Sequence, residues 1–334
     1  MSTRPPQDDD RPQRGEHRQA PAQNSAPDLD AVMSERRALT NLAYRLLGSL
    51  ADAEDVVQET YARWYAMTPE RQAEIASPGG WLTKVAGRIC LDQLRSARAR
   101  RERYVGEWLP EPVPGGTGWS LGRDAHSTAD PADRVTLDES VTMAFLVVLD
   151  SLTPAERVAF VLHDVFRYPF ADIADVVGRA PAACRQLATS ARRHIRAAQT
   201  PVAPATAQRA AVVSDFRQAW QAQDIKALVA LLDPDARAVT DTGGLVQAGA
   251  RSLAGAEAIA RGLIELFHRV PDLTVEERAV NGLPGLVIQQ AGVTVTVMAL
   301  EVSGDRVTDL WAMRNPEKLG MWRVGTAGST ETAV

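Results

Sequence analysis

The pattern changes from helical to non-helical within residues 95–112, RSARARRERYVGEWLPEP. This stretch therefore sets a boundary between the segments on either side of it. Its first half reads as the basic end of a helix, with five arginines against the single acid Glu102. Its second half cannot be helical, because Pro110 and Pro112 lack backbone donors and push the residues before them toward extended geometry. Trp108 and Leu109 are large and apolar, so we expect them to dock on another part of the chain. The alternative is a plain linker anchored by one tryptophan.

Length, net charge, cysteine content and apolar runs limit the classes of protein to which this sequence can belong. A chain of 334 residues is long enough for two or three domains. Its formal net charge of −5 does not indicate a nucleic-acid binder, although binding depends on local patches. Cys90 and Cys184 lie far apart, which predicts neither a disulfide framework nor a metal site and fits a reducing cytoplasm. No apolar run reaches the roughly 18–20 residues of a membrane span, and the N-terminus has no apolar signal core, so we expect a cytoplasmic protein without a membrane partner.

The first 105 residues divide into a tail and a helical unit. Residues 1–30 are rich in proline, glutamine and charge and are predicted to be disordered. Residues 31–105 are predicted to form three helices, because apolar residues recur at helical spacing and Ser77-Pro78-Gly79-Gly80 interrupts the pattern before Trp81. Asp52 is expected to cap the second of these helices.

The second and third of these helices carry opposite charges. The second has an apolar stripe opposite a row of acids, which by itself is typical of a solvated face near a helix N-terminus. The third, starting at Trp81, has a cationic side that includes Lys84, Arg88 and Arg95. Trp64, Tyr65 and Trp81 could stack on nucleic-acid bases, but core packing is the expected role of at least two of them.

These residues carry a resemblance to a known family. GSLADAEDVVQETYARWY, followed by WLTKVAGRICLDQLRSARARRE, resembles the promoter-melting domain of bacterial sigma-70 factors of the extracytoplasmic-function group. The resemblance implies that the acidic helix binds core RNA polymerase through Asp52, Glu54, Asp55, Gln58 and Glu59. It also implies that the third helix faces the −10 element of promoter DNA through Trp81, Lys84, Arg88, Asp92, Arg95 and Arg98.

A linker and a second helical unit follow. Residues 106–130 contain the WLPEP stretch and then a Gly-, Ser- and Thr-rich tether. Residues 131–200 are predicted to be helical, with Thr153 and Pro154 at one helix start. Phe170–Val177, Gly178 and Ala180–Arg196 give a helix, a tight turn and a longer helix, which is the helix-turn-helix pattern.

The longer helix of this pair is basic and lacks acids. Phosphate and base-edge contacts are therefore predicted for it, whereas a plain helical hairpin is the alternative. The unit resembles the sigma domain that reads the −35 element. The candidate DNA-binding residues are Arg179, Arg185, Gln186, Thr189, Arg192 and Arg193.

Residues 206–326 have a different pattern. Two helices are predicted before a strand at Ala236–Thr240, then a helix at Ala254–Val270. Four more strands follow, at Thr274–Val280, Leu286–Gln290, Val293–Val302 and Arg306–Met313, with hairpin turns at Asn281-Gly282 and Gly304-Asp305. This order describes an α+β cone. It resembles the SnoaL-like superfamily, whose cone often encloses a pocket, so a small ligand inside the cone is kept open as a further partner.

The three parts together resemble the SigJ-like subgroup, which carries a SnoaL-like extension. The fold class is thus multidomain, with two all-α sigma domains, the second a helix-turn-helix, followed by an α+β cone. The subgroup resemblance implies that three motifs form one regulatory contact. They are the WLPEP stretch, Asp241–Leu245 and Asn315–Leu319, although the Asp241–Leu245 motif lacks the lysine expected there. The contact residues are Trp108, Leu109, Pro110, Glu111, Pro112, Asp241, Gly243, Gly244, Asn315, Pro316, Lys318 and Leu319.

We interpret the chain as a sigma factor that is regulated by its own cone, and we do not expect it to be an enzyme. His268, Asp241, Asp272 and Glu301 are the acid-base candidates in the cone, and no phosphate loop, metal cluster or nucleophile elbow occurs in the sequence, so no cofactor or metal is expected. Two alternatives remain. One is a free-standing DNA-binding regulator, and the other is a SnoaL-type ligand-sensing or enzymatic domain fused to a DNA-binding regulator.

Overall fold

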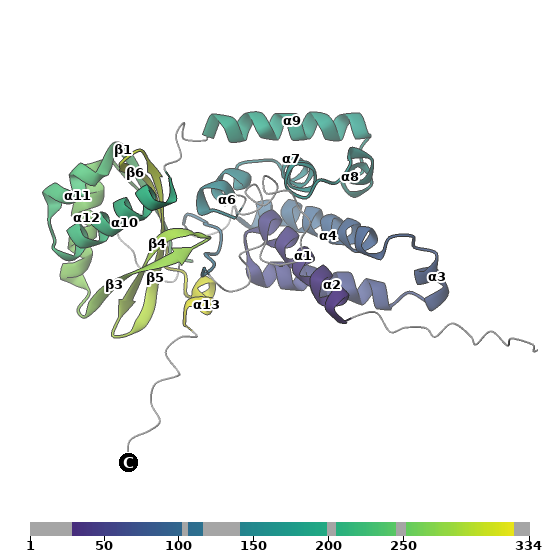
Figure 1. Ribbon diagram of the computed structural model, residues 1–334, viewed down its shortest axis with the longest axis horizontal. Coiled ribbons are helices and arrows are strands. Elements are labelled where there is room, and N and C mark those ends of the chain that lie inside the picture. Colours follow the sequence, from purple (N-terminus) through teal and green to yellow (C-terminus); the bar gives the residue numbers. More distant parts are fainter. Residues whose placement is uncertain (1–28, 102–105, 116–140, 199–204, 245–251, 324–334) are drawn as a thin grey trace, which may run out of the picture.

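The computed structural model describes residues 29–101, 106–115, 141–198, 205–244 and 252–323. The predicted disordered tail, apart from its last two residues, and the linker beyond Gly115 lie outside the described residues. Figure 1 shows helices gathered on one side of the molecule and a sheet flanked by helices on the other, with α13 between them. Among the described residues, no helix is long and apolar enough to cross a bilayer.

The first helical unit (residues 29–101) has four helices rather than the three predicted. A short helix that the sequence pattern missed lies between the second and third predicted ones, where Thr68 caps it and Pro69 begins it. The predicted cap of the second helix was wrong, because the side chain of Ser49 accepts the N–H of Asp52 and Asp52 lies inside the first turn. The helices are α1 (Leu29–Leu47), α2 (Leu50–Tyr65), α3 (Pro69–Ala73) and α4 (Pro78–Arg101).

The second helical unit (residues 141–198) contains the helix-turn-helix. Thr153 and Glu156 form a reciprocal capping box at the start of α7. Gly178 ends α8 with φ of 72°, a left-handed conformation that favours glycine and lets the chain turn into α9. The elements are α6 (Met143–Asp150), α7 (Pro154–Phe160), the π-helix η1 (Val161–Val165), α8 (Phe170–Val177) and α9 (Pro181–Ala198).

The cone (residues 205–323) is a six-stranded sheet in the order β2-β1-β6-β5-β4-β3. Strands β1 and β6 pair in parallel and the other neighbours are antiparallel. The strands are β1 (Leu232–Asp241), β2 (Ser252–Ala254), β3 (Leu273–Val280), β4 (Leu283–Gln290), β5 (Val293–Ser303) and β6 (Arg306–Met313). The helices are α10 (Thr206–Gln221), α11 (Ile225–Leu231), α12 (Ala256–Arg269), η2 (Pro316–Leu319) and α13 (Gly320–Arg323).

Several boundaries in the cone were predicted wrongly. Strand β4 begins at Leu283 instead of Leu286, because Leu283 already pairs with Val280 of β3. Strand β1 begins at Leu232 instead of Ala236, because Leu232 already pairs with Val307 of β6. Ala254, predicted as the first residue of the following helix, instead ends the short strand β2 (residues 252–254), which pairs with β1, and Gly255 with φ of 88° separates β2 from α12. Pairing with other strands decides these boundaries, and local propensity carries no record of such partners.

The sheet presents two apolar faces because side chains alternate along each strand. On β5, Met298 and Leu300 point into the interior of the cone, beneath α10, α11 and α12. Val297 and Ala299 point to the opposite face, which is covered by Leu109 of the linker and Met143 of α6. The outer face of the sheet is therefore the surface that holds the cone to the rest of the chain.

The two helical units share one apolar core. Buried residues of α1, α2 and α4 form a single cluster with buried residues of α6, α7, α8 and α9. Arg157 of α7 is 3% exposed and donates to the carbonyl oxygen of Leu46 at the end of α1, at 3.0 Å. The units predicted from sequence as separate domains on a tether pack against each other in this structure.

Candidate functional site

A lysine near the C-terminus ties the linker segment (residues 106–115) to the cone. Lys318 Nζ lies 2.8 Å from Asp241 Oδ2 and 2.6 Å from the carbonyl oxygen of Leu109. The same carboxylate oxygen accepts the backbone N–H of Leu109 at 2.9 Å. The Asp241 side chain is fully buried and that of Lys318 is 12% exposed, so water screens this ion pair only weakly. The first strand, the linker and the C-terminal segment meet at this point.

Trp108 extends this contact to the first helical unit. The ammonium group of Lys318 lies 4.2 Å from the centre of the Trp108 ring, a cation–π geometry. On the other side, Gly48 has φ of 71°, and a Cβ there would stand 2.8 Å from the Trp108 ring. The turn between α1 and α2 therefore needs a glycine both for its conformation and for the approach of the tryptophan.

The rest of the WLPEP stretch is buried along the same surface. Leu109, Pro110, Glu111 and Pro112 are all buried. Trp322 of α13 donates from its indole nitrogen to the carbonyl oxygen of Pro112 at 2.9 Å. Trp322 was missed by the sequence analysis, and its signal was a large aromatic residue shortly after the Asn315–Leu319 motif.

The linker does not behave as a free tether over its first part. Val113 is 4% exposed, and Gly115 donates its backbone N–H to the carbonyl oxygen of Ala279 at 2.9 Å. Pro114 forms a β-bridge with Val280 at the end of β3. The tether predicted to follow the WLPEP stretch is therefore not free at residues 113–115, because these residues extend the edge of the sheet.

Glu111 links the linker to the helix predicted to bind polymerase. Its Oε2 accepts the backbone N–H of Leu50, the first residue of α2, at 2.8 Å. A carboxylate at this end of a helix also interacts favourably with the positive end of the helix dipole. Burial raises the pKa of Glu111, and the Leu50 hydrogen bond and Lys318 oppose that rise.

The predicted polymerase-binding residues lie together on the outer side of α2. Glu54, Asp55, Gln58 and Glu59 are exposed, and Asp52 is half-buried. Glu59 pairs with Arg63 one turn later at 2.9 Å, with both side chains about half exposed. This acidic face (Asp52, Glu54, Asp55, Gln58 and Glu59) is accessible to a partner.

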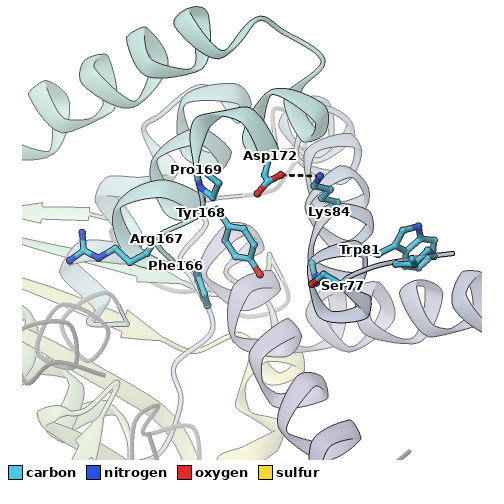
Figure 2. A pocket seen from close by; sticks show the side chains of 10 residues that line it. Ser77, Trp81, Lys84, Phe166, Arg167, Tyr168, Pro169 and Asp172 are labelled. Carbon is cyan, nitrogen blue, oxygen red and sulfur yellow. Dashed lines mark hydrogen bonds and ion pairs between the residues drawn. The ribbon is translucent and has the colours of Figure 1, made fainter. Parts of the chain in front are cut away.

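The predicted −10 residues whose side chains the structure describes divide into two that bond to the second helical unit and others that do not. Lys84 Nζ pairs with Asp172 and Asp175 of α8 at 3.0 and 3.1 Å, and these bonds raise the pKa of Lys84. Figure 2 shows the Lys84–Asp172 pair at the side of a pocket that lies between the first turns of α4 and the segment leading into α8. The pocket has a volume of about 510 Å³. Arg88 donates from Nε and Nη2 to the carbonyl oxygen of Asp175 at 3.0 and 2.7 Å. These two cations therefore serve the contact with the second helical unit.

Among the described side chains, the other residues of this group form no ion pair with α8, although Trp81 lines the same pocket as Lys84. Trp81 is half-buried and packs edge-on against Trp64, with ring centres 5.3 Å apart. Asp92 and Arg95 pair at 3.3 Å on an exposed part of the helix. Arg98 belongs to α4, but its side chain lies outside what the structure describes. Tyr65, by contrast, is exposed.

The recognition helix α9 presents most of its predicted residues outward. Arg185, Gln186, Thr189 and Arg193 are exposed and line a shallow hollow, while Arg179 is exposed at the turn before the helix. Arg185 lies over the ring of Phe170 at 5.2 Å. Arg192 differs from them, because it turns inward and makes a two-bond ion pair with Asp164 of η1 at 2.7 and 3.1 Å.

The acid-base candidates of the cone do not share one site. Asp241 is engaged with Lys318, and Glu301 pairs with buried Arg209 at 2.9 Å. His268 and Asp272 are exposed at and just after the end of α12. The described part of the chain contains no group of His, Cys, Asp and Glu side chains arranged to hold a metal ion.

Three family models match the chain, one for each folded part. Sigma-70 region 2 matches residues 31–100, sigma-70 region 4 matches residues 142–195, and the SnoaL-like domain matches residues 213–330. The fold and the matches together define the class, a sigma-70-type factor with a SnoaL-like domain after its helix-turn-helix.

Similar proteins place the chain in a smaller group within this class. The ECF RNA polymerase sigma factor SigJ of Mycobacterium tuberculosis H37Rv is 39% identical over 85% of this chain and 90% of its own. The probable ECF RNA polymerase sigma factor SigI of Mycobacterium tuberculosis CDC 1551 is 32% identical over 89% of this chain and 97% of its own. The crystal structure of Mycobacterium tuberculosis SigJ matches with a TM-score of 0.68 and 34% identity, over 88% of this chain and 99% of that one.

The chain therefore belongs to the extracytoplasmic-function RNA polymerase sigma factors. This membership confirms the predicted family, the fold class and the function as a sigma factor that directs core RNA polymerase to promoter DNA. Members of the family are transcription initiation factors and not enzymes.

Proposed function

We propose that the cone holds this sigma factor in a closed state that opens when it binds core polymerase and promoter DNA. The observation that carries this proposal is the contact of Lys318 with both Asp241 and Leu109, which fastens the segment between the two helical units to the cone. The packing of α4 against α8 gives the closed state a functional consequence, since it engages Lys84 and Arg88, two of the cations expected to face the −10 element, in bonds to α8.

Helix geometry supports the need for opening. Helix α9 packs on α8, and α8 packs on α4. Two such helix-to-helix steps separate α4 from α9 by roughly 20 Å. The −10 and −35 elements are named for positions 25 base pairs apart, which in B-form DNA is roughly 85 Å. The two units must therefore separate before α4 and α9 can reach their elements together.

The residue assignments follow from accessibility in the closed state. The acidic face of α2 is open, so we assign it to core polymerase, which can bind before the units separate. Lys84 and Arg88 join promoter contacts after opening, beside Trp81, Asp92, Arg95 and Arg98. On α9 we assign base reading to Arg185, Gln186 and Thr189, with Arg179 and Arg193 on phosphates, and Arg192 holding the fold through Asp164.

The cone acts in this proposal as a regulatory element without chemistry of its own. Its acid-base candidates are engaged or dispersed, as described above. Phe216, Trp220 and Leu228, all fully buried, fill its interior within the described residues, so the proposal assigns no ligand to it.

Run-off transcription with core polymerase tests the closed state. The variant Lys318→Met removes the ammonium group while keeping an apolar stem of similar length. We expect it to transcribe more than the wild type at limiting core polymerase, because the linker is released from the cone. Equal transcription would contradict a brake, and reduced transcription would mean that the cone braces the active form. Arg261→Met, an exposed ion-paired cation on α12, is the control.

A further inference from the structure

The turn between β3 and β4 holds an asparagine that the Lys318 contact does not involve. Asn281 and Gly282 form this two-residue turn, with φ of 50° and 79°. Asn-Gly is a common pair in such turns, and a hairpin turn ordinarily projects into solvent. Asn281, however, is 2% exposed. Its burial means that other parts of the chain close over the turn.

The groups around Asn281 come from three separate parts of the chain. Its Nδ2 donates to Tyr44 Oη of α1 and to the carbonyl oxygen of Val141 just before α6, both at 2.9 Å. Its Oδ1 accepts the backbone N–H of Val113 at 3.2 Å. Its own backbone N–H donates to the carbonyl oxygen of Val113 at 2.8 Å. One residue of the cone therefore bonds to the first helical unit, the linker segment and the second helical unit.

Tyr44 continues this network to the acidic helix. Its hydroxyl donates to the carbonyl oxygen of Glu111 at 2.7 Å, while the side chain of Glu111 accepts the first N–H of α2. Tyr44 is fully buried, and burial raises its pKa, so the neutral hydroxyl remains the donor. Asn281 is thus connected through Tyr44 and Glu111 to the start of α2.

The turn itself does not require the amide. Glycine adopts positive φ without strain, so a glycine at position 281 would satisfy the backbone. The amide instead satisfies buried polar groups that belong to other parts of the chain, and an unsatisfied buried carbonyl or hydroxyl is costly. Moving either helical unit away from the turn would break at least one of these bonds.

We propose that Asn281 is a positioning residue through which the cone sets the orientation of the two helical units relative to each other. This proposal rests on the proposed closed state and identifies a second contact that maintains it. Lys318 fastens the linker alone, whereas Asn281 reaches both units directly. Loss of its amide should loosen the second unit at Val141 and the first at Tyr44, and so change transcription without altering the acidic face or α9.

The test compares two variants with a matched control. Asn281→Gly keeps the turn and removes the side chain, and Asn281→Asp keeps the size but replaces the donor to Val141 with an acceptor. Ala291→Gly is the control, because Ala291 also has positive φ, at 49°, in the exposed β4–β5 turn. Labels at Glu74→Cys beyond α3 and Ala197→Cys on α9 report the distance between the units, since both positions are exposed and the native cysteines are buried.

We expect both Asn281 variants to shift the label distance in the free full-length factor to longer values and to change run-off transcription several-fold. Ala291→Gly should match the wild type in both. Amide exchange in β4 and β5 reports whether the cone is intact, and if Asn281→Gly disturbs it, Asn281→Asp decides. Unchanged distance and transcription in the variant that keeps the cone intact would overturn the proposal. If Lys318→Met then still lengthens the distance, the closed state stands without Asn281, and if it does not, the closed state fails as well.

Discussion

The ammonium group of Lys318 lies 2.8 Å from the carboxylate of Asp241, at a place where the aspartate is fully buried. An ion pair of this kind adds little compared with a well-packed apolar pair, but removing one partner leaves a buried charge uncompensated. The strength of the contact thus depends on both residues being present, and the backbone of Leu109 shares in it through a bond to each of them.

The first prediction concerns the cost of removing one partner of this buried ion pair. Lys318→Met should destabilise the cone by about 3–5 kcal/mol, the usual cost of orphaning a buried charge. Combining it with Asp241→Asn should recover part of that loss, because no ionised group then remains buried. Denaturant unfolding of the single and double variants measures the coupling between the two sites. Additive losses would show that the two side chains do not interact.

The second prediction concerns the contact between the helical units. Each exposed ion pair of Lys84 contributes less than about 1 kcal/mol, so apolar packing is expected to hold α4 against α8. A Cβ at Gly87 of α4 would stand 3.0 Å from Val176 of α8 and 3.7 Å from Leu162. Gly87→Leu should therefore act as a wedge and expose the amides of α8 to faster hydrogen exchange.

The control for the wedge is Ser96→Leu, which places the same side chain on an exposed part of α4. It should leave exchange in α8 as in the wild type. Slow exchange in α8 of Gly87→Leu, with normal folding, would mean that the units yield around the new side chain instead of separating.

The sequence predicted local structure better than the relations between parts. Helix α8 and strand β6 have the bounds that periodicity predicts, because their own residues set the pattern. Trp108 and Leu109 were expected to find a cover for the same local reason. The shared core was not predicted, since a helix stripe does not reveal which partner covers it.

The contacts of single side chains were also not predictable from the sequence. Asn281 was interpreted only as a turn residue, because Asn-Gly indicates a turn whatever its side chain contacts. Asp172 and Asp175 were given no role in the sequence analysis, because their contact with Lys84 depends on a helix that precedes them by more than 70 residues. Non-local partners of this kind leave no periodic signal in one sequence.

The third prediction concerns the acidic face of α2. Glu54→Lys with Asp55→Lys should weaken binding to core polymerase, most strongly at low salt, because screening reduces charge effects as salt rises. Thermal stability should change little, since exposed charges contribute little to folding. Glu70→Lys with Glu74→Lys on and beside α3 is the matched control. Equal affinity of both double variants for core polymerase would sink the assignment.

The fourth prediction concerns pH. Burial raises the pKa of Glu111 above its ordinary value of 4.5, and Asp52 and Glu54 add to the rise. The folded state therefore binds this proton more tightly than the unfolded state, so its share of stability is present below 4.5 and is lost as the pH rises to the raised pKa. Glu111→Gln keeps an acceptor for Leu50 without the charge.

Melting temperatures measured against pH check this prediction. Glu111→Gln should be at least as stable as the wild type near neutral pH, and its advantage should shrink as the pH falls toward the ordinary carboxyl pKa. A variant that is less stable than the wild type at neutral pH would show that the ionised carboxylate supports the fold, for example through the dipole of α2.

The distance between the two helical units tests the central claim most directly. Labels at Glu74→Cys and Ala197→Cys can be followed in the free factor and in its complex with core polymerase and promoter DNA. The closed state predicts one fixed distance in the free factor and a longer one in the promoter complex, because the two elements lie roughly 85 Å apart. A free factor that already shows the longer distance, or a complex that keeps the distance of the free factor, would contradict it.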